Sequence, residues 1–229
     1  TEVDHVLKTR RDWEAHYLPR LQYAIERVSD IPVLNGDGFI GWSNGGETFL
    51  QGDDRRYWYG LYCGSLFGKI RNIAGLVGIS YLWVDDEVLF CEMIDTFGEL
   101  CYRCTEAALA SGAKFDFAHF WEDICFRGGP LIVPKVFAER VGPHYRRITD
   151  LVRRHGIDIV SVDCDGKIDD LIAPWLENGV NTMFPIEVGT WGASMAPWRA
   201  RYGRELRGVG GMDKRVLARD FAAIDAEIE

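Results

Sequence analysis

Four groups of polar residues in this 229-residue chain directly follow apolar, strand-like segments and carry side chains suited to catalysis. Carboxylates that gather in one place raise one another's pKa unless a cation or a hydrogen-bond donor compensates. Such clusters serve as general acids and bases or as metal sites. The four groups are His119, Glu122 and Asp123; Asp163, Cys164 and Asp165; Glu187; and Gly210, Gly211, Asp213 and Lys214.

The segment Asp163-Cys164-Asp165-Gly166 places two carboxylates and a thiol at the end of a predicted strand, with a glycine to turn the chain. Two acids in alternating positions can face one centre. In the alternative interpretation, Asp165-Gly166 is a turn and one aspartate caps a helix that begins near Ile168. We take Asp163 and Asp165 as catalytic candidates and, together with His119, as candidate ligands of a divalent metal, zinc or another.

His119, Asp123 and Glu187 complete the set of predicted catalytic residues. Imidazole and carboxylate together suit either a metal site or acid–base work, although a single histidine is also common as a structural residue. Glu187 follows an apolar strand, where a carboxylate needs a partner. A salt bridge across the rim of the sheet is the alternative role for Glu187.

Substrate-binding candidates lie in two loops. The glycine-rich strand end that contains Gly210 and Gly211, followed by Asp213, can present backbone N–H groups to an anion. Arg127 follows Asp123 in the next loop and could meet a substrate carboxylate, although an exposed loop arginine is the commoner case.

The elements that must position these residues alternate between short β-prone runs and longer helical stretches from about Gly60 onward. A helix is predicted over 86–111 and a strand over 115–117, followed by a helix from Pro134 that Pro143 kinks. Further strands are predicted over 157–162, 182–184 and 206–209, with helices over 168–178 and up to Gly203 between them. The glycines that close three of these units, Gly156, Gly179 and Gly203, lie 23 and 24 residues apart.

This repetition predicts an α/β fold, either an open doubly wound sheet or a closed (βα)₈ barrel. Because the dinucleotide fingerprint and the P-loop are absent, we favour the (βα)₈ TIM-type barrel. Five to six βα units are visible where eight are needed, so one or two are expected outside this chain. The absent initiator methionine and an end within a helical stretch also suggest a fragment. Residues 1–57, with a helix over 13–28 and a Gly- and Trp-rich stretch over 36–52, are expected to decorate the partial barrel of residues 58–229.

Composition narrows the function classes. With 26 basic and 35 acidic residues the formal charge is −9, which argues against nucleic acid as a partner. No apolar run has the length of a membrane span, so no membrane association is expected. The six cysteines are too dilute for a disulfide framework, and a cytoplasmic protein that acts on a small molecule is expected.

The chain resembles the uroporphyrinogen decarboxylase-like superfamily over roughly residues 58–229. That superfamily also includes cobalamin-dependent methyltransferases that act on thiols. The resemblance implies a (βα)₈ barrel with its cleft at the strand ends. The motifs that carry it are Gly64-Ser65-Leu66-Phe67-Gly68, Glu122-Asp123, Gly129-Pro130-Leu131-Ile132-Val133-Pro134, Tyr145-Arg146-Arg147-Ile148, His155-Gly156-Ile157-Asp158 and Gly210-Gly211-Met212-Asp213-Lys214.

The chain also departs from that superfamily. Its zinc-dependent methyltransferases have a His-x-Cys pair where this chain has Asp163 and Asp165, which would form a harder, oxygen-based site. The N-terminal arginine-rich segment of the decarboxylases has no match before residue 55.

Three functions follow from the resemblance. The first is a methyltransferase-like enzyme, with cobalamin or a corrinoid protein as the methyl donor and a metal at the acidic strand end. The second is a cofactor-free decarboxylase that binds a tetrapyrrole through basic residues. The third is a non-catalytic protein that binds a corrinoid or another small ligand. The basic residues expected for the second function are Arg55, Arg56, Lys69, Arg71 and Arg127.

Overall fold

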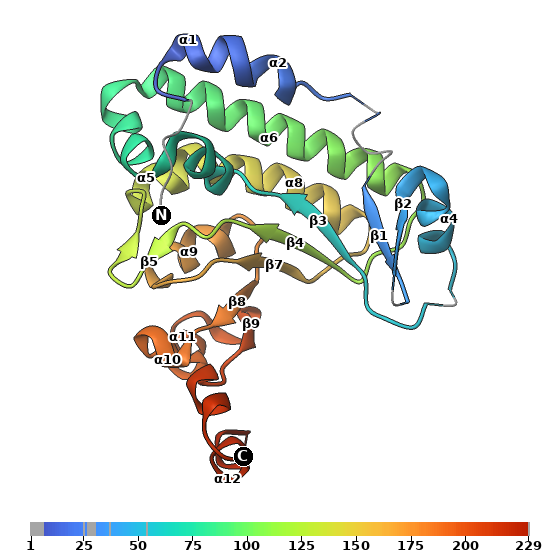
Figure 1. Ribbon diagram of the computed structural model, residues 1–229, viewed down its shortest axis with the longest axis vertical. Coiled ribbons are helices and arrows are strands. Elements are labelled where there is room, and N and C mark those ends of the chain that lie inside the picture. The colour runs from blue at the N-terminus through green and yellow to red at the C-terminus, as the bar shows by residue number, and fades with distance from the viewer. Residues whose placement is uncertain (1–6, 25, 27–30, 37, 54, 229) are drawn as a thin grey trace.

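The computed structural model, which describes residues 7–24, 26, 31–36, 38–53 and 55–228, is built on a five-stranded parallel sheet (Figure 1). Every neighbouring pair of strands is parallel, and the order of the strands in space is their order along the chain. The strands are β3 (Gly60–Gly64), β4 (Phe117–Trp121), β7 (Val160–Asp163), β8 (Thr182–Ile186) and β9 (Arg207–Gly210).

Sequential order distinguishes this sheet from a doubly wound one, in which the strand order reverses at a switch point. In the described part of the chain β3 and β9 each pair with one neighbour, so the sheet has two free edges. The observed architecture is therefore a mixed α/β fold whose central sheet is compatible with a barrel.

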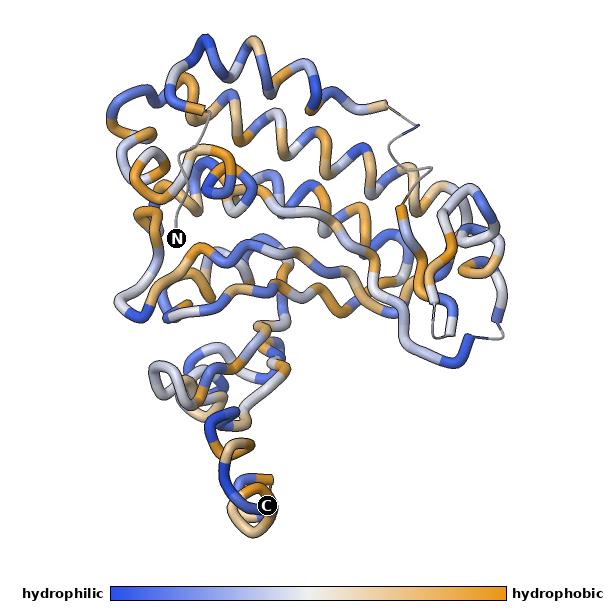
Figure 2. The backbone as a smooth tube through the Cα atoms, in the orientation of Figure 1, coloured by the Kyte–Doolittle hydropathy of each residue, from blue (hydrophilic) through white to orange (hydrophobic). Residues whose placement is uncertain are grey.

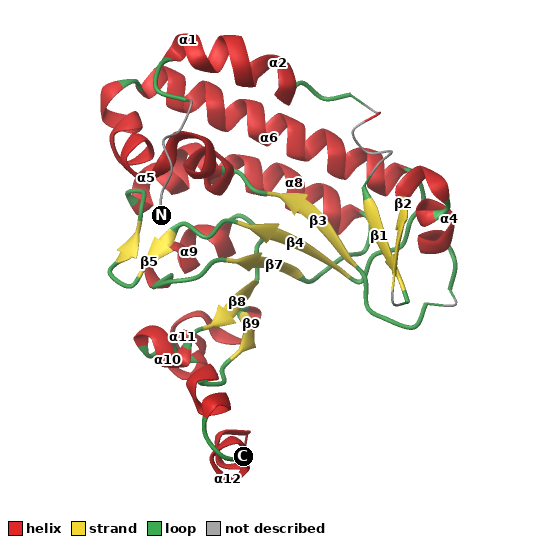
Figure 3. Cartoon of the chain, viewed as in Figure 1, coloured by secondary structure: helices red, strands yellow, loops and turns green. Residues whose placement is uncertain are grey.

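Helices cover one face of the sheet (Figure 3). The first are α5 (Phe67–Asp85) and α6 (Glu87–Ala110), and a small hairpin of β5 (Cys125–Phe126) and β6 (Gly129–Pro130) follows β4. Next along the chain come α7 (Pro134–Val136), the π-helix η3 (Phe137–Val141), α8 (Gly142–Arg154), α9 (Asp169–Glu177), α10 (Val188–Trp191) and α11 (Met195–Tyr202). The C-terminal elements are the 3₁₀-helices η4 (Gly203–Glu205) and η5 (Lys214–Ala218), and α12 (Phe221–Ile228).

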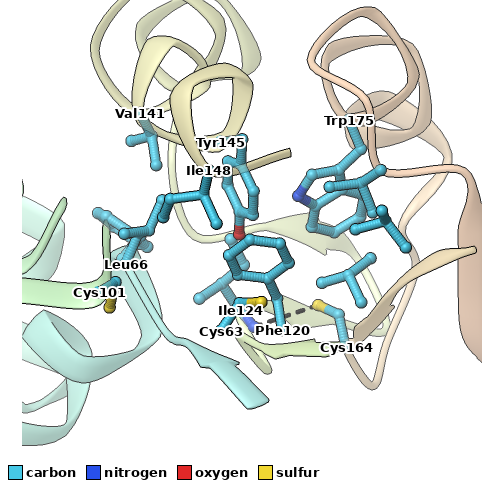
Figure 4. Close-up of a cluster of buried hydrophobic side chains, with 14 of the residues drawn as sticks. Cys63, Leu66, Cys101, Phe120, Ile124, Val141, Tyr145, Ile148, Cys164 and Trp175 are labelled. Atoms are coloured by element: carbon cyan, nitrogen blue, oxygen red, sulfur yellow. Dashed lines mark hydrogen bonds between the residues drawn. The ribbon is translucent and has the colours of Figure 1, made fainter. Parts of the chain in front are cut away.

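Alternation along each strand decides which side chains meet the helices. Ala118 and Phe120 of β4 are fully buried on the helix side, with Val162 of β7 beside them. Figure 4 shows Phe120 beneath Tyr145 of α8, with their ring centroids 4.8 Å apart, and Trp175 of α9 in the same cluster. The opposite side of the sheet has Tyr62, which is 55% exposed, and this face is called the inner face below. Because helices cover one face of these strands, apolar residues recur along them (Figure 2).

Most predicted elements are confirmed, with shifted ends. The helix over 86–111 is α6 and that over 168–178 is α9. The helix from Pro134 runs to Arg154 but widens into the π-helical turn η3. Pro143, which cannot donate a backbone hydrogen bond to the preceding turn, directly follows this widening. The strand predicted over 115–117 begins at Phe117 and continues to Trp121.

The N-terminal segment packs against α6. It contains a continuous helical stretch of α1 (Arg10–Asp12), the π-helix η1 (Trp13–Tyr17) and α2 (Leu18–Leu21). The predicted helix over 13–28 is thus confirmed only to residue 21, and its residues 25, 27 and 28 lie outside the described part. Trp13 is buried and its Nε1 donates a hydrogen bond to Glu92 of α6 at 2.8 Å.

The next element is a hairpin that begins just before the predicted Gly- and Trp-rich stretch and ends inside it. Its strands are β1 (Pro32–Asn35) and β2 (Gly38–Gly41), and η2 (Trp42–Asn44) and α4 (Gly46–Gln51) come next. Within the described ranges, none of the helices combines the length and the apolar character needed to cross a membrane.

One buried carboxylate joins three segments at the carboxyl end of β4. Glu122 is fully buried, and its Oε1 accepts hydrogen bonds from the backbone N of Leu66 at 2.7 Å and from the hydroxyl of Tyr145 at 2.5 Å. Its Oε2 accepts from the backbone N of Gly68 at 2.6 Å. A Cβ on Gly68 would lie 2.1 Å from the carbonyl oxygen of Glu122, so this approach requires glycine. Burial raises the pKa of Glu122, and these hydrogen bonds oppose the shift by favouring the carboxylate.

We expect Glu122→Gln to lower the free energy of unfolding by about 2–3 kcal/mol, because the amide nitrogen would face a backbone N–H and leave it unpaired in the interior. Urea denaturation followed by circular dichroism measures the change. Tyr145→Phe is the matched control: it removes one of the three donors and should cost about 1–2 kcal/mol. If Glu122→Gln were as stable as the wild type, the carboxylate would not be stabilising this junction.

Candidate functional site

Besides the buried Glu122, four carboxylates lie at or just beyond the carboxyl ends of three neighbouring strands. Asp163 is the last residue of β7, and its register partners are Trp121 on β4 and Phe184 on β8. The other three acids follow these strands in the chain; they are Asp123, Asp165 and Glu187. The predicted convergence of acids at one edge of the sheet thus has a structural basis in the register of β4, β7 and β8.

Asp163 has the electrostatic properties of an acid–base group. Burial raises its pKa to about 6, with added repulsion from Asp165 and Asp123. Burial also raises the pKa of the more exposed Asp165, together with repulsion from Glu187 and Asp123, while Lys214 acts in the opposite direction. A carboxyl that titrates near pH 6 can both accept and release a proton under physiological conditions.

Asp123 links the two loops that surround Asp163. Its backbone is in the left-handed region, with φ of 54°, which non-glycine residues seldom adopt. Its Oδ1 accepts a hydrogen bond from the backbone N of Asp165 at 3.2 Å, and its Oδ2 lies 3.5 Å from Nη1 of Arg71. The same Arg71 nitrogen donates to the carbonyl oxygen of Asp123, and the guanidinium lies 5.5 Å from the ring centre of Trp121. Asp123 therefore fixes the loop after β4 relative to the loop after β7 and to Arg71.

Glu187 is engaged with its surroundings. It is 9% exposed, and its Oε2 accepts a hydrogen bond from the backbone N of Gly166 at 2.7 Å. Its Oε1 accepts from Thr190 at 2.9 Å and lies 3.9 Å from Nζ of Lys214. These contacts match the alternative structural role, a partnered carboxylate at the rim, and its catalytic role stays a prediction.

The glycine-rich segment predicted to bind an anion, which contains Gly210, Gly211 and Asp213, makes hydrogen bonds within the protein. The backbone N of Gly211 donates to the carbonyl of Ile186 at 3.1 Å, and Asp213 accepts from the backbone N of Arg215 at 3.0 Å. Gly210 has a φ of 105°, as expected of a glycine at a strand end. Arg127 lies at the exposed turn between β5 and β6, and no ion pair joins it to the four carboxylates within the described residues. The substrate-binding role of these residues stays a prediction.

His119 lies inside a strand, contrary to the expectation that it follows one. It is the third residue of β4, and its Nδ1 lies 2.8 Å from Oγ of Ser161 on β7. The cause is the late start of β4: the segment Phe117-Ala118-His119-Phe120-Trp121 alternates in burial, which is typical of a strand with one covered face. His119 therefore lies on the inner face, as Trp121 does, two residues closer to the amino end of β4.

In the part of the chain that the structure describes, no group of three His, Cys, Asp or Glu side chains is placed to hold a metal ion. The predicted set of Asp163, Asp165 and His119 combines two strand-end acids with a histidine from the middle of a strand. The role of Asp163, Asp165 and His119 as metal ligands therefore stays a prediction.

The basic residues expected for a tetrapyrrole lie at two ends of the sheet. Arg55 forms an ion pair with Asp116 at 3.2 Å, just before β4 begins, and Arg56 lies over Tyr57. Lys69 and Arg71 instead lie in the first turns of α5, after the carboxyl end of β3. From the sequence these basic residues were expected to act together, and neither Trp121 nor Ser161 was predicted as a site residue. The alternation around His119 could have identified Trp121.

Comparison with known proteins gives a likeness of fold. No known protein family matches this sequence, and no curated protein matches it. A solved structure, a methyltransferase from Methanosarcina mazei, is similar with a TM-score of 0.58 and 14% sequence identity. The match covers 79% of this chain and 51% of that chain, so this chain spans about half the length of that methyltransferase. The two proteins share an α/β fold.

We expect Asp163→Asn to make the protein more stable than the wild type at pH 8 and equally stable near pH 3. The pKa of Asp163 rises from 3.8 to about 6 on folding, so between these values the folded state holds more protons and wild-type stability falls as pH rises. Because Asp163 is only half-buried, solvent screening reduces the gain to roughly 1 kcal/mol. Urea denaturation at several pH values measures it.

The control for this prediction is Asp225→Asn in α12, which removes the same charge from an exposed position. It should retain the wild-type dependence of stability on pH. An Asp163→Asn variant with that same dependence would show that Asp163 titrates normally.

Proposed function

We propose that this protein is a methyltransferase-like enzyme that acts on a small molecule, with Asp163 as its acid–base residue. The observation that carries the proposal is the position of Asp163 at the end of β7, where burial and the neighbouring acids raise its pKa to about 6. The similar fold of a methyltransferase from Methanosarcina mazei supports the class of reaction.

The proposal includes the (βα)₈ barrel. A sheet whose strands follow chain order, with all pairs parallel and two free edges, has the topology of a barrel segment. In such barrels the reacting groups lie at the carboxyl ends of the strands, where Asp163 is found.

Methyl transfer to an acceptor that carries O–H, N–H or S–H needs a base. As the lone pair of the acceptor forms a bond to the methyl carbon, the bond from that carbon to the donor breaks and leaves its electron pair on the donor. The proton of the acceptor passes to the carboxylate of Asp163. At pH 7 a carboxyl with a pKa of about 6 is mostly ionised and still basic enough to take this proton.

The other residues support this role. Asp123 and Arg71 fix the loop that follows β4, and the charges of Asp123 and Asp165 help to keep the pKa of Asp163 high. The ring of Trp121 lies on the same face and offers an apolar wall. Cobalamin, free or on a corrinoid protein, is the methyl donor of the proposal because of the family resemblance.

The test is transfer of an isotope-labelled methyl group from methylcobalamin to a mixture of small thiols, amines and alcohols, followed by mass spectrometry. Turnover should increase with pH through about pH 6 as one group ionises. Asp163→Asn should lower kcat/KM by about 10²- to 10³-fold, while Asp225→Asn leaves it unchanged. Equal activity of Asp163→Asn and the wild type would contradict the role of Asp163. Release of CO₂ from a carboxylated tetrapyrrole, without methyl transfer, would instead identify a decarboxylase.

A further inference from the structure

The inner face of the sheet contains a cavity that the proposed reaction does not use. Its volume is about 700 Å³, within the range of pockets that bind small molecules. The walls come from all five strands and from residues beside them, and most of the lining side chains are apolar or aromatic. The lining residues that matter here are Trp58, Tyr62, Phe117, His119, Ser161 and Phe184.

His119 is the polar centre of this cavity, and its hydrogen bonds define its tautomer. The hydroxyl of Ser161 donates to the carbonyl oxygen of Ala118 at 3.2 Å. With its single hydrogen assigned to that bond, the hydroxyl accepts at its 2.8 Å contact with Nδ1 of His119, and we assign this contact as Nδ1–H donating to Oγ. Nε2 then carries the lone pair.

The imidazole is neutral as well as oriented. Burial lowers the pKa of His119, which favours the uncharged ring near pH 7. Within the described residues its ring nitrogens have one hydrogen bond, that of Nδ1 to Ser161. Nε2 therefore remains as an acceptor on a ring that lines the cavity.

Aromatic rings define the shape of the space next to Nε2. The ring of Phe184 stands edge-on to His119, with a centroid distance of 6.4 Å and an interplanar angle of 68°. The ring of Phe117 lies against Gly60, where a Cβ would approach it to 2.5 Å. Tyr62 and Trp58 are largely exposed on the same face, at 55% and 83%. Large aromatic surfaces that face solvent favour a flat apolar ligand.

We propose that this inner face binds a flat, largely apolar small molecule whose N–H or O–H group donates a hydrogen bond to Nε2 of His119. The aromatic side chains contact its faces and edges. Ser161 is a positioning residue that fixes the tautomer of His119. This cavity adjoins the carboxylates at the strand ends, because Phe184 is the register partner of Asp163. The hydrogen bond to His119 involves neither Asp163 nor methyl transfer, so this binding does not depend on the proposed function.

Indole and 1-methylindole test the proposal, because they share a flat ring system and only indole has an N–H donor. In calorimetric or NMR titrations of the whole chain, indole should bind about tenfold more tightly than 1-methylindole. In His119→Phe the preference should vanish while 1-methylindole still binds, which also shows that the variant is folded. Failure of the wild type to bind either compound, or an unchanged preference in His119→Phe, would overturn the proposal.

The tautomer is measured separately by ¹⁵N–¹H NMR of the histidine rings. The wild type should show His119 protonated at Nδ1, and added indole should shift its Nε2 resonance. Ser161→Ala should lose the Nδ1–H signature and weaken indole binding, without affecting 1-methylindole. Protonation at Nε2 in the wild type would refute the hydrogen-bond scheme.

Sedimentation of the same samples tests a different occupant of this face. A dimer that excludes both compounds would show that a second copy of the chain covers the inner face, and would overturn the proposal.

Discussion

The carboxylate of Glu122 is the interaction on which the rest of the structure depends. It binds the backbone at the start of α5 and the hydroxyl of Tyr145, so β3, β4 and α8 meet at one buried group. The next residue, Asp123, turns the chain in a left-handed conformation and bonds to the loop after β7. Because the two acids are adjacent, the buried one fixes where the second can lie. The geometry around Asp163 therefore begins with a group that has no contact with solvent.

The fold was predictable where periodicity was strong. Long amphipathic stretches predicted α6 and α9 to within a residue or two, and glycines marked the ends of units. The starts of the strands were less predictable, because residues such as Phe115 and Ile157 continue the apolar pattern outside the sheet. Pairing with a neighbouring strand decides where a strand begins, and it is not a local property. Because the predicted strand ended at residue 117, His119 was expected in a loop, whereas it lies within β4 on the inner face.

The candidate site was predictable as a location and less so as a set of roles. Glu122 and Asp123 are neighbours with similar chemistry, yet one is sealed under α5 and the other lies between Arg71 and Asp165. Asp163 and Asp165 likewise differ, since Asp163 ends a strand and is the more buried of the two. Burial and hydrogen-bond partners come from segments distant in the chain, and sequence spacing does not contain them.

The order of the strands also bears on how such a chain can change in length over evolution. Among the strands of this sheet, each pairs with the one that precedes or follows it in chain order, as in proteins built from tandem repeats. A new unit can dock at the outer side of β3 or β9 without separating any existing pair. In a sheet with a switch point, an insertion at the centre would break ladders on both sides. A βα unit added at either edge of such a sheet would leave the hydrogen bonds around Asp163 intact.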